Sequence, residues 1–436
     1  MTLLIISPDY ASHLLPLATL GTAWSEAGER VVVASGNATA AIVRGFGFES
    51  LPLQLGKGSN PGVIRAEQQP TGEDDALRGF FDATRLGMIE TLVFQAEARL
   101  SDLMWEPVRS ARLVQALVRE LAPDTIIVDH LAFSARLALV ASGVPYVDVV
   151  LGHPTALPVG DEVYGFPPVW PAAFTPTAGE LHNLRELCER VSKNFTSQWN
   201  TALAELAPLA GPSTDAFAEH GDLLLYNYPE ELCPPARTAK FGPHRFLGAA
   251  VRAEGPDAEV AAWLNFSDEP FVYVSFGSFL SVRADVLARV CAALKLLGIR
   301  GAIAVGSADR QVLGELPPEW LVREFLPQVT LLGRAAAAVT HGGNNSVTES
   351  MMLGVPLVVL PFSTDQFAGA AALEDAGFGV VLPPNTATVT ELADALRHAL
   401  ELPIQARAAL DALSRGLTDQ VGSQRAYRAV ASEPTS

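Results

Sequence analysis

One stretch of the sequence, residues 340–366, gathers the residue types that hold an anion. It reads THGGNNSVTESMMLGVPLVVLPFSTDQ, with a histidine, two glycines, two asparagines and a serine side by side after a run of small apolar residues. Glycines at a strand-to-helix turn let the backbone approach a ligand, and the start of the next helix offers unpaired N–H groups and partial positive charge. The stretch therefore predicts an anion seat that includes His341, Gly343, Asn345 and Ser346.

Several of these residues also have purely structural explanations. Asn345 or Ser346 can serve as the N-cap of the predicted helix, and Glu349, three residues after Ser346, fits a capping box. His341 can equally be a histidine at the edge of the core, bonded to a carbonyl. A second glycine turn, SFGSFLS, follows the apolar run FVYV, and from there Gly277 and Ser278 can close over the same anion.

The first half of the chain supplies candidates for proton transfer. His13 lies at the opening of a predicted helix, for which Ser12 is a plausible N-cap. A helix N-terminus disfavours an imidazolium, so we expect His13 to be neutral and able to accept a proton. Asp129 ends the apolar run TIIVD and can orient that imidazole through its far nitrogen. The alternatives are a structural His13 and an Asp129 that caps the following helix; His130 is expected to point elsewhere.

Short β-branched runs alternate with helical stretches through both halves, which is typical of βαβ units around a parallel sheet. We therefore predict an α/β fold of two doubly wound domains facing each other across a cleft, with ligands at the carboxyl ends of the strands. The predicted strands are at 3–7, 30–35, 125–129, 144–151 and 223–228, and then at 271–277, 302–306, 322–326, 336–340, 356–361 and 379–383.

The expected domains are an N-terminal domain at 1–228, a linker at 229–256 that is rich in proline, glycine and charge, and a C-terminal domain at 257–416. A terminal helix and tail at 417–436 is expected to pack back on the N-terminal domain. Irregular insertions at 55–100 and 154–176 interrupt the first series of strands and are expected to form a pocket wall. The aromatic residues of this part of the chain can line that pocket or belong to the core: Phe80, Phe81, Phe94, Trp105, Tyr164, Phe166 and Trp170.

Bulk composition excludes several classes of protein. The chain has 436 residues, enough for two cores, and a formal net charge of −18, which disfavours a nucleic-acid partner. Its three cysteines are far apart, which favours neither a disulfide framework nor a zinc site. Because the first apolar run is short and lacks a basic flank, and no window reaches about 18 apolar residues, we expect a cytoplasmic protein without a membrane span. For the oligomeric state, a monomer and a homodimer both stay open.

With these residues in place, a family resemblance becomes specific. Residues 325–366 resemble the donor-binding signature of family 1 glycosyltransferases, the enzymes dependent on uridine-diphosphate sugars that include many actinomycete antibiotic enzymes. The match holds in order and without gaps at Pro327-Gln328, Thr340-His341, Gly343, Asn345-Ser346, Glu349, Gly354-Val355-Pro356, Pro361 and Asp365-Gln366. The fold implied by this resemblance is GT-B, two Rossmann-like domains around a cleft.

The resemblance also implies roles for single residues. Phe325 would stack on the base, where the family commonly has tryptophan, and Gln328 would bond the base edge; the smaller ring leaves uracil and thymine both open. His341, Asn345 and Ser346 would contact the phosphates, and Glu349 would accept from the ribose hydroxyls. Asp365 and Gln366 would bond the sugar hydroxyls, and the pair favours a fully hydroxylated hexose, glucose first. Arg334 and Asn344 differ from the plant pattern without removing any of these contacts.

The implied activity is transfer of a hexose from UDP-sugar, or from dTDP-sugar, to a hydrophobic or aromatic small molecule. Configuration would invert, with His13 as base. We expect no cofactor and no metal, because the sequence lacks an Asp-x-Asp motif and the turn amides, Ser278, His341 and the helix dipole can stabilise the leaving charge without a cation. A nicotinamide oxidoreductase is disfavoured, since GFGFES is the nearest approach to GxGxxG. A non-catalytic nucleotide-sugar binder or an epimerase of the same architecture stays open.

Overall fold

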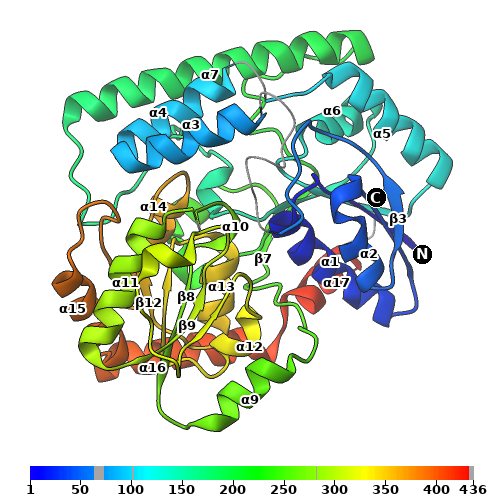
Figure 1. Cartoon of the computed structure of the whole chain (residues 1–436). Coiled ribbons are helices and arrows are strands. Elements are labelled where there is room, and N and C mark those ends of the chain that lie inside the picture. The colour runs from blue at the N-terminus through cyan, green and yellow to red at the C-terminus, as the bar shows by residue number, and fades with distance from the viewer. Residues whose placement is uncertain (63–72, 101–102, 281, 432–436) are drawn as a thin grey trace.

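The strands of the described residues form two separate sheets, each entirely parallel (Figure 1). The computed structural model describes residues 1–62, 73–100, 103–280 and 282–431; the side chains of residues 73, 74, 278 and 279 are also outside that description. Among these residues the first sheet has the order β3-β2-β1-β4-β5-β6-β7 and the second β10-β9-β8-β11-β12-β13. Two doubly wound sheets confirm the predicted fold class.

The first sheet uses short strands from the first half of the chain. Their bounds are β1 Thr2–Ile6, β2 Arg30–Ser35, β3 Glu49–Pro52, β4 Thr125–Asp129, β5 Val147–Val150, β6 Leu223–Tyr226 and β7 His244–Phe246. The strands of the second sheet are β8 Phe271–Ser275, β9 Arg300–Ala304, β10 Leu321–Arg323, β11 Ala337–Thr340, β12 Leu357–Val359 and β13 Gly379–Val381. β7 lies inside 229–256, so part of the segment that we expect to join the domains adds an edge strand to the first sheet.

Helices connect the strands and cover the faces of both sheets (Figure 1). In the first half they are α1 Ala11–Glu26, α2 Ala40–Gly45, α3 Glu73–Leu86, α4 Met88–Arg99, α5 Pro107–Leu121, α6 Phe133–Ser142, α7 Ala178–Leu206 and α8 Pro235–Thr238. In the second half they are α9 Ala258–Phe266, α10 Gly277–Leu280, α11 Ala284–Leu297, α12 Gln328–Leu332, α13 Asn344–Met352, α14 Gln366–Asp375, α15 Val389–Leu400, α16 Ile404–Asp419 and α17 Gly422–Ala431.

Both faces of each sheet are buried, which explains the continuous apolar runs in the sequence. On β1, Leu4 and Ile6 pack into one core cluster while Leu3 and Ile5 pack into another on the opposite face. The second cluster also includes Ala426 of α17, so the last described helix lies against α1 of the first half, as Figure 1 shows. There the ring of Tyr427 meets Trp24 edge-on at 5.1 Å between ring centroids.

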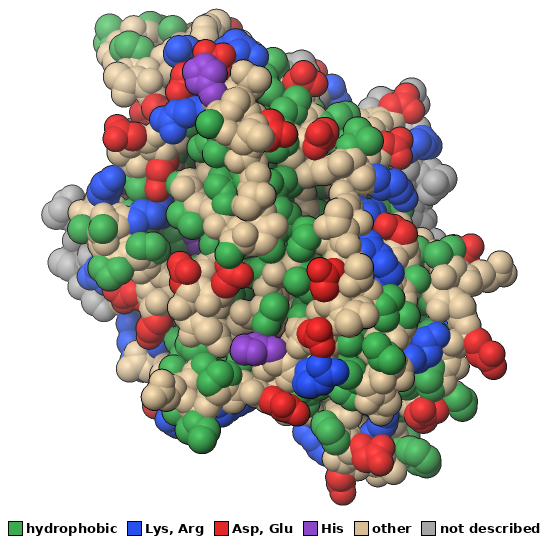
Figure 2. All heavy atoms as spheres, turned by 90° about the vertical axis from the view of Figure 1, so that its left-hand side faces the viewer, with side chains coloured by type: hydrophobic (Ala, Val, Ile, Leu, Met, Phe, Trp, Pro, Cys, Tyr) green, Lys and Arg blue, Asp and Glu red, His purple; other side chains and the backbone are tan. Residues whose placement is uncertain are grey.

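The outer surface mixes charges of both signs. Over the face shown in Figure 2, basic and acidic side chains are interspersed with neutral and hydrophobic ones, and the basic ones do not form an extended stripe. None of the helices described is long and apolar enough to cross a membrane.

The strand order places the candidate residues at one location. Each sheet changes winding direction beside its first strand, between β1 and β4 in the first sheet and between β8 and β11 in the second. Ligands of doubly wound folds bind outside the carboxyl ends of the strands at such a point. His13 and Asp129 follow β1 and end β4, and the turns at Gly277 and His341 follow β8 and β11.

Candidate active site

A cavity of about 800 Å³ lies between the two sheets and is lined from both halves of the chain. We call its two sides the donor arm, lined by residues from Arg252 onwards, and the acceptor arm, lined by residues before it. Most of the site residues predicted from the sequence line it: His13, Gly277, Phe325, Gln328, His341, Gly343, Asn345, Ser346, Asp365 and Gln366. Asp129 and Glu349 stand behind lining residues, and the side chain of Ser278 is outside the described residues.

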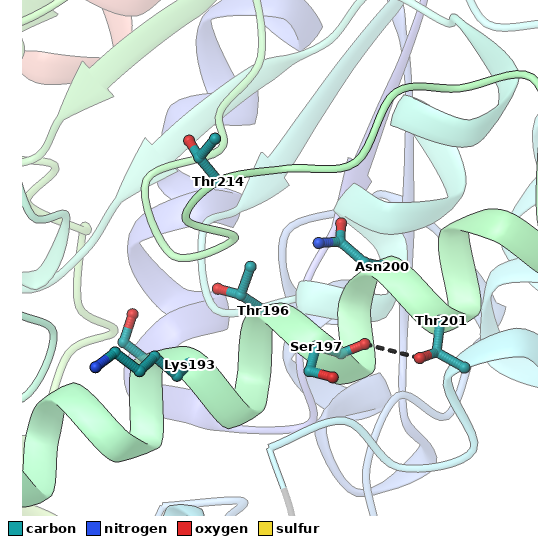
Figure 3. A pocket seen from close by; sticks show the side chains of 7 residues that line it. Lys193, Thr196, Ser197, Asn200, Thr201 and Thr214 are labelled. Atoms are coloured by element: carbon teal, nitrogen blue, oxygen red, sulfur yellow. Dashed lines mark hydrogen bonds between the residues drawn. The ribbon is translucent and has the colours of Figure 1, made fainter.

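A second hollow, of about 580 Å³, runs along α7 (Figure 3). Its lining consists of hydroxyl and amide side chains and one lysine: Ser192, Lys193, Thr196, Ser197, Asn200, Thr201 and Thr214. The Thr201 hydroxyl donates to the Ser197 carbonyl within the helix. Because it has no carboxylate or imidazole to move a proton, we assign it no catalytic role.

His13 and Asp129 form a direct pair in the acceptor arm. His13 is in the first turn of α1, and its Nδ1 lies 2.6 Å from Oδ2 of Asp129 at the end of β4. The carboxylate is fully buried, whereas the histidine side chain is 21% exposed. Oδ1 of Asp129 accepts from the Leu131 N–H at 2.9 Å, which fixes the carboxyl plane. With Nδ1–H donated to the carboxylate, Nε2 of His13 is the nitrogen that can take a proton.

The electrostatics of the pair correct one expectation. Burial opposes the charged imidazolium, but the charge and hydrogen bond of Asp129 outweigh it, so the pKa of His13 is raised rather than lowered. The Asp129 carboxyl, although buried, has its pKa lowered by His13. Ser12 is not the N-cap; the cap position is Tyr10 and makes no side-chain cap bond. The helix start therefore does not decide the protonation of His13, because the nearby carboxylate is stronger.

His130 lines the cavity, contrary to the expectation that it points elsewhere. It is 2% exposed, and neither ring nitrogen has a hydrogen-bond partner among the described residues. Its Nδ1 lies 3.7 Å from Oδ1 of Asp129, beyond hydrogen-bond distance. Burial lowers the pKa of His130 to about 4, so the ring is neutral at physiological pH.

The glycines of the donor arm make room for the His341 ring. A Cβ on Gly277, where φ is 68°, would lie 2.8 Å from Cε1 of His341, and one on Gly343 would overlap the same ring. Burial lowers the pKa of His341 to about 4, so the ring is neutral. A neutral imidazole held between two glycine turns at the start of α13 is placed to donate to an anion without carrying charge itself.

The start of α13 differs in detail from the predicted caps. Gly343 is the N-cap, so Asn345 and Ser346 lie in the first helical turn instead of capping it. Two asparagines of this turn reach the first half of the chain. Nδ2 of Asn344 donates to the carbonyls of Leu151 and Asn227 at 2.7 and 2.9 Å, and Nδ2 of Asn345 donates to the Ser12 carbonyl at 2.8 Å. These bonds hold the two halves closed over the cavity.

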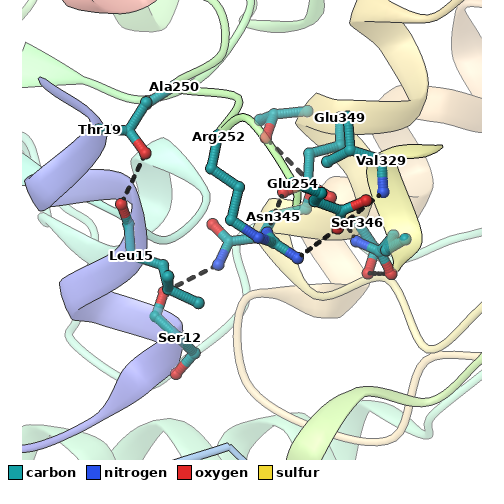
Figure 4. Close-up of polar contacts among 12 residues, drawn as sticks. Ser12, Leu15, Thr19, Ala250, Arg252, Glu254, Val329, Asn345, Ser346 and Glu349 are labelled. Carbon is teal, nitrogen blue, oxygen red and sulfur yellow. Dashed lines mark hydrogen bonds and ion pairs between the residues drawn. The ribbon is translucent and has the colours of Figure 1, made fainter. Parts of the chain in front are cut away.

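Glu349 belongs to a network, shown in Figure 4, and not to a capping box. Its Oε1 accepts from Arg252 at 2.9 Å, and its Oε2 accepts from Nε2 of Gln328 at 2.5 Å. Arg252 also bonds Glu254 at 3.0 Å, and Glu254 accepts from the Val329 and Thr330 N–H groups at the start of α12. Burial raises the pKa of Glu349, and Arg252 offsets part of that rise.

Arg252 is the residue that sequence reasoning missed. It comes from the segment expected to be a linker, yet its side chain lines the donor arm together with Tyr273 and Gln328. No guanidinium was predicted in the donor arm from the sequence, and the structure places one there. The sequence contains no local signal for this contact, because Arg252 and Glu349 are 97 positions apart.

The base-stacking candidate Phe325 and the sugar-contacting candidate Asp365 both line the donor arm. Phe325 is 61% exposed, a free ring at the surface of the cavity. Oδ2 of Asp365 accepts from the His153 N–H at 2.6 Å, and Oδ1 accepts from the Thr364 hydroxyl. Thr364 adopts a left-handed φ of 52°, an unfavourable region for a β-branched residue, which presents Asp365 to the acceptor arm.

Gln366 is largely committed to its own loop. Its Oε1 accepts from the Phe362 and Ser363 N–H groups at 3.0 and 3.2 Å, and its Nε2 donates to the Ser363 hydroxyl at 3.3 Å. It is 8% exposed at the cavity surface. The amide therefore holds the segment that carries Asp365.

The aromatic residues expected around the acceptor divide into those that line the cavity and those that do not, and Trp105 belongs to the second group. Phe80, Phe94, Tyr164 and Phe166 line the cavity, as the pocket-wall interpretation predicts. Phe81 is a core residue, and Trp170 packs against Phe367 at 5.1 Å between ring centroids. Residues 63–72 of the first insertion are outside the described residues.

Comparison with known proteins identifies relatives of both parts of the chain. Residues 241–420 match the family model described as UDP-glucoronosyl and UDP-glucosyl transferase. A PGL/p-HBAD biosynthesis glycosyltransferase of Mycobacterium tuberculosis is 28% identical over 295 residues, which cover 65% of this chain and 64% of that relative. The matched region thus spans less than two thirds of the curated relative.

Solved structures extend the similarity to the whole chain. The glycotransferase of kitacinnamycin superposes with a TM-score of 0.70 at 20% identity, covering 99% of this chain and 98% of that one. A spinosyn rhamnosyltransferase complexed with thymidine diphosphate gives 0.66 at 20% identity, covering 99% and 100%. At this identity the likeness shows the fold. Residues 241–420 are therefore similar to the UDP-glucoronosyl and UDP-glucosyl transferase family, and the chain as a whole has the GT-B fold of these solved glycosyltransferases.

Proposed function

We propose that the protein is an inverting, metal-independent glycosyltransferase. It moves a hexose from a nucleotide-diphosphate sugar held in the donor arm to a hydrophobic or aromatic small molecule held in the acceptor arm. The observation that carries the proposal is the His13–Asp129 pair, which faces the glycine turns of the donor arm across one cavity. The charge of Asp365 also raises the pKa of His13, so the sugar end of the donor arm lies close to the base.

The chemistry follows from this arrangement. Nε2 of His13 takes the proton of the acceptor hydroxyl, and Asp129 stabilises the imidazolium that forms. The acceptor oxygen attacks the anomeric carbon from the side opposite the diphosphate. The bond from that carbon to the diphosphate breaks with its electron pair going to the diphosphate, and the configuration inverts.

The leaving diphosphate meets donors already in place. The turn at His341, the first turn of α13 and the hydroxyl of Ser346 offer neutral hydrogen-bond donors, and Arg252 adds a cation on the same wall. These groups support a reaction without a metal ion or other cofactor. Closure of the two halves through Asn344 and Asn345 favours transfer over hydrolysis, because it excludes water from the bond being broken.

The choice of donor rests on individual side chains. Glu349 can accept from ribose hydroxyls, and Gln328 can bond the base edge, which supports UDP as the preferred nucleotide. The thymidine diphosphate bound to the similar rhamnosyltransferase supports dTDP as the second choice. Asp365, held by its loop, supports a fully hydroxylated sugar, with glucose first. The aromatic walls of the acceptor arm support a flat or greasy acceptor.

A donor and acceptor panel tests the proposal. The protein is incubated with UDP- and dTDP-sugars and with aromatic or macrolide acceptors in the presence of a chelator, and products are identified by mass. We expect a product whose mass is increased by one hexose, with the chelator having no effect. Nucleotide binding without any product, or conversion of one sugar nucleotide into its epimer, would instead favour a binding protein or an epimerase.

A further inference from the structure

The acceptor arm contains an arginine in an unusual setting. Phe94, Gln95, Ala98 and Arg99 of α4 line the cavity, and their spacing puts them on one face of that helix. Arg99 is the last residue of α4, and the loop at residues 164–167 lines the cavity beside it.

The guanidinium of Arg99 is held in place by aromatic rings. Its central carbon lies 5.2 Å from the centroid of the Tyr164 ring. Tyr164 stacks on Phe217 at 3.8 Å with 6° between the planes, and Phe217 stacks on Phe195 at 4.1 Å. A planar cation on such a stack keeps its charge and has little freedom to move.

This cation lacks a carboxylate partner among the residues described. A neighbouring arginine provides the contrast. Arg185 lies 5.7 Å from the centroid of Phe166, but it pairs with Glu189 at 3.1 Å, donates to the Asp161 carbonyl, and does not line the cavity. The carboxylate side chains on the described cavity wall, Glu324 and Asp365, both belong to the donor arm. Arg99 has no carboxylate partner among the described residues, and none of the described residues that line the acceptor arm carries a carboxylate, so Arg99 is suited to bind an anionic ligand.

Two further polar groups of this arm are unsatisfied. Oε1 of Gln95 is buried without a hydrogen-bond partner among the described residues, and so are both ring nitrogens of His130. Because buried polar groups in proteins are nearly always paired, these groups indicate that a polar ligand completes them. His130 lies beside Asp129, so a ligand that reaches from Arg99 to His130 ends at the reacting pair.

We propose that the acceptor is an aromatic molecule that carries a carboxylate, and that Arg99 binds this carboxylate while the acceptor hydroxyl is presented to His13 and His130. The ring of Phe94 and the edge of the Tyr164 ring contact the body of the molecule. That the bound molecule is the acceptor of a transfer reaction rests on the proposed function. Binding of its carboxylate by Arg99 can be tested without that reaction.

A matched pair of ligands tests the subsite without relying on turnover. Binding of hydroxynaphthoic acid and of its methyl ester is measured by fluorescence titration near neutral pH, where the acid is ionised and the ester is not. We expect the wild-type protein to bind the acid about tenfold more tightly than the ester. The ratio should fall to about one in Arg99→Gln and stay partly intact in Arg99→Lys.

Arg185→Gln is the control variant, because it removes an arginine that also lies over an aromatic ring but already has its partners. Its ratio should equal that of the wild type, and thermal melting should show each variant to be folded. The inference is overturned if the wild-type protein binds the ester as well as the acid, if it binds neither, or if Arg99→Gln keeps the preference. Transfer to a neutral phenol, measured in parallel, tests the proposed function separately.

Discussion

The donor arm and the acceptor arm of the cavity differ in how their polar side chains are paired. In the donor arm, Glu349 is bonded to both Gln328 and Arg252, and Gln366 is bonded to its loop, whereas Nδ1 of His341 has no partner among the described residues. In the acceptor arm, the guanidinium of Arg99 contacts an aromatic face, and neither ring nitrogen of His130 has a hydrogen-bond partner among the described residues. Side chains that are already bonded to one another form a rigid site for a nucleotide. Side chains without partners depend on the ligand to complete their hydrogen bonds. The difference indicates that nucleotide affinity and acceptor choice are separable properties.

Replacement of His13 gives the largest expected effect and tests this separation directly. His13→Ala should lower turnover by about a thousandfold, because general base catalysis is lost, while UDP affinity changes less than about twofold. Turnover is measured by product mass and affinity by calorimetry. The control is His398→Ala, an exposed histidine on α15, which should leave both unchanged. Unchanged product formation in His13→Ala would show that His13 is not the base. It would also contradict the separation of nucleotide binding from catalysis between the two arms.

Asp129→Asn should have the next largest effect, a loss of about a hundredfold in kcat, together with a shift in pH dependence. The carboxylate raises the pKa of His13 above the ordinary value of 6.5, and only the neutral ring is a base. In the wild type, kcat/KM should therefore fall as pH drops through a value above 6.5. In the variant this acidic limb should move to lower pH. If kcat/KM of Asp129→Asn falls at the same pH as that of the wild type, a group other than His13 controls the acidic limb.

Arg252→Met tests whether the cation of Arg252 keeps Glu349 ionised in the donor arm. Without its cation, the buried Glu349 should bind a proton at higher pH, since burial already raises its pKa and Glu254 adds negative charge nearby. We expect UDP affinity to fall about tenfold near neutral pH and to fall further with acidification, whereas wild-type affinity holds to lower pH. Arg252→Lys should keep part of the affinity.

Calorimetry between about pH 8 and about pH 6 measures this change. Arg323→Met is a suitable control, because Arg323 pairs with Asp257 and Glu259 away from the cavity lining. A uniform loss at every pH in Arg252→Met would show that Arg252 acts on the ligand directly and not through Glu349.

Gln366→Ala should give the smallest effect. Its amide holds the Phe362 and Ser363 N–H groups, so the loop that carries Asp365 should loosen. Selection between UDP-glucose and UDP-galactose should weaken by about threefold to tenfold while affinity for free UDP stays constant. Competition assays measure the selection. Equal losses for UDP and for the UDP-sugars would show that the residue serves the nucleotide.

The strands and site residues that were predictable from the sequence are those with local signals. Buried strands such as Arg30–Ser35 and Thr125–Asp129 begin and end where the apolar runs do. The edge strands β3 and β7 were missed, because each is short and partly polar, and β7 follows a proline-rich segment. The signature at 325–366 predicted residues that line the donor arm, because their spacing within one stretch carries the information.

Contacts between distant segments were not predictable. Arg252 reaches Glu349, and Asn344 reaches the carbonyls of Leu151 and Asn227, only because the two halves close on each other. The pKa of His13 depends on a carboxylate 116 positions away, which is why an argument from its own helix gave the wrong direction. The exposure of His130 to the cavity likewise depends on backbone geometry after β4 that its sequence neighbours do not specify.

A structure of the protein with a non-transferable fluorinated analogue of UDP-glucose tests the central claim most directly. We expect the diphosphate at the turn of His341 and Ser346, the ribose hydroxyls on Glu349, and the anomeric carbon facing Nε2 of His13. A nucleotide bound elsewhere, or an anomeric carbon turned away from His13, would contradict it.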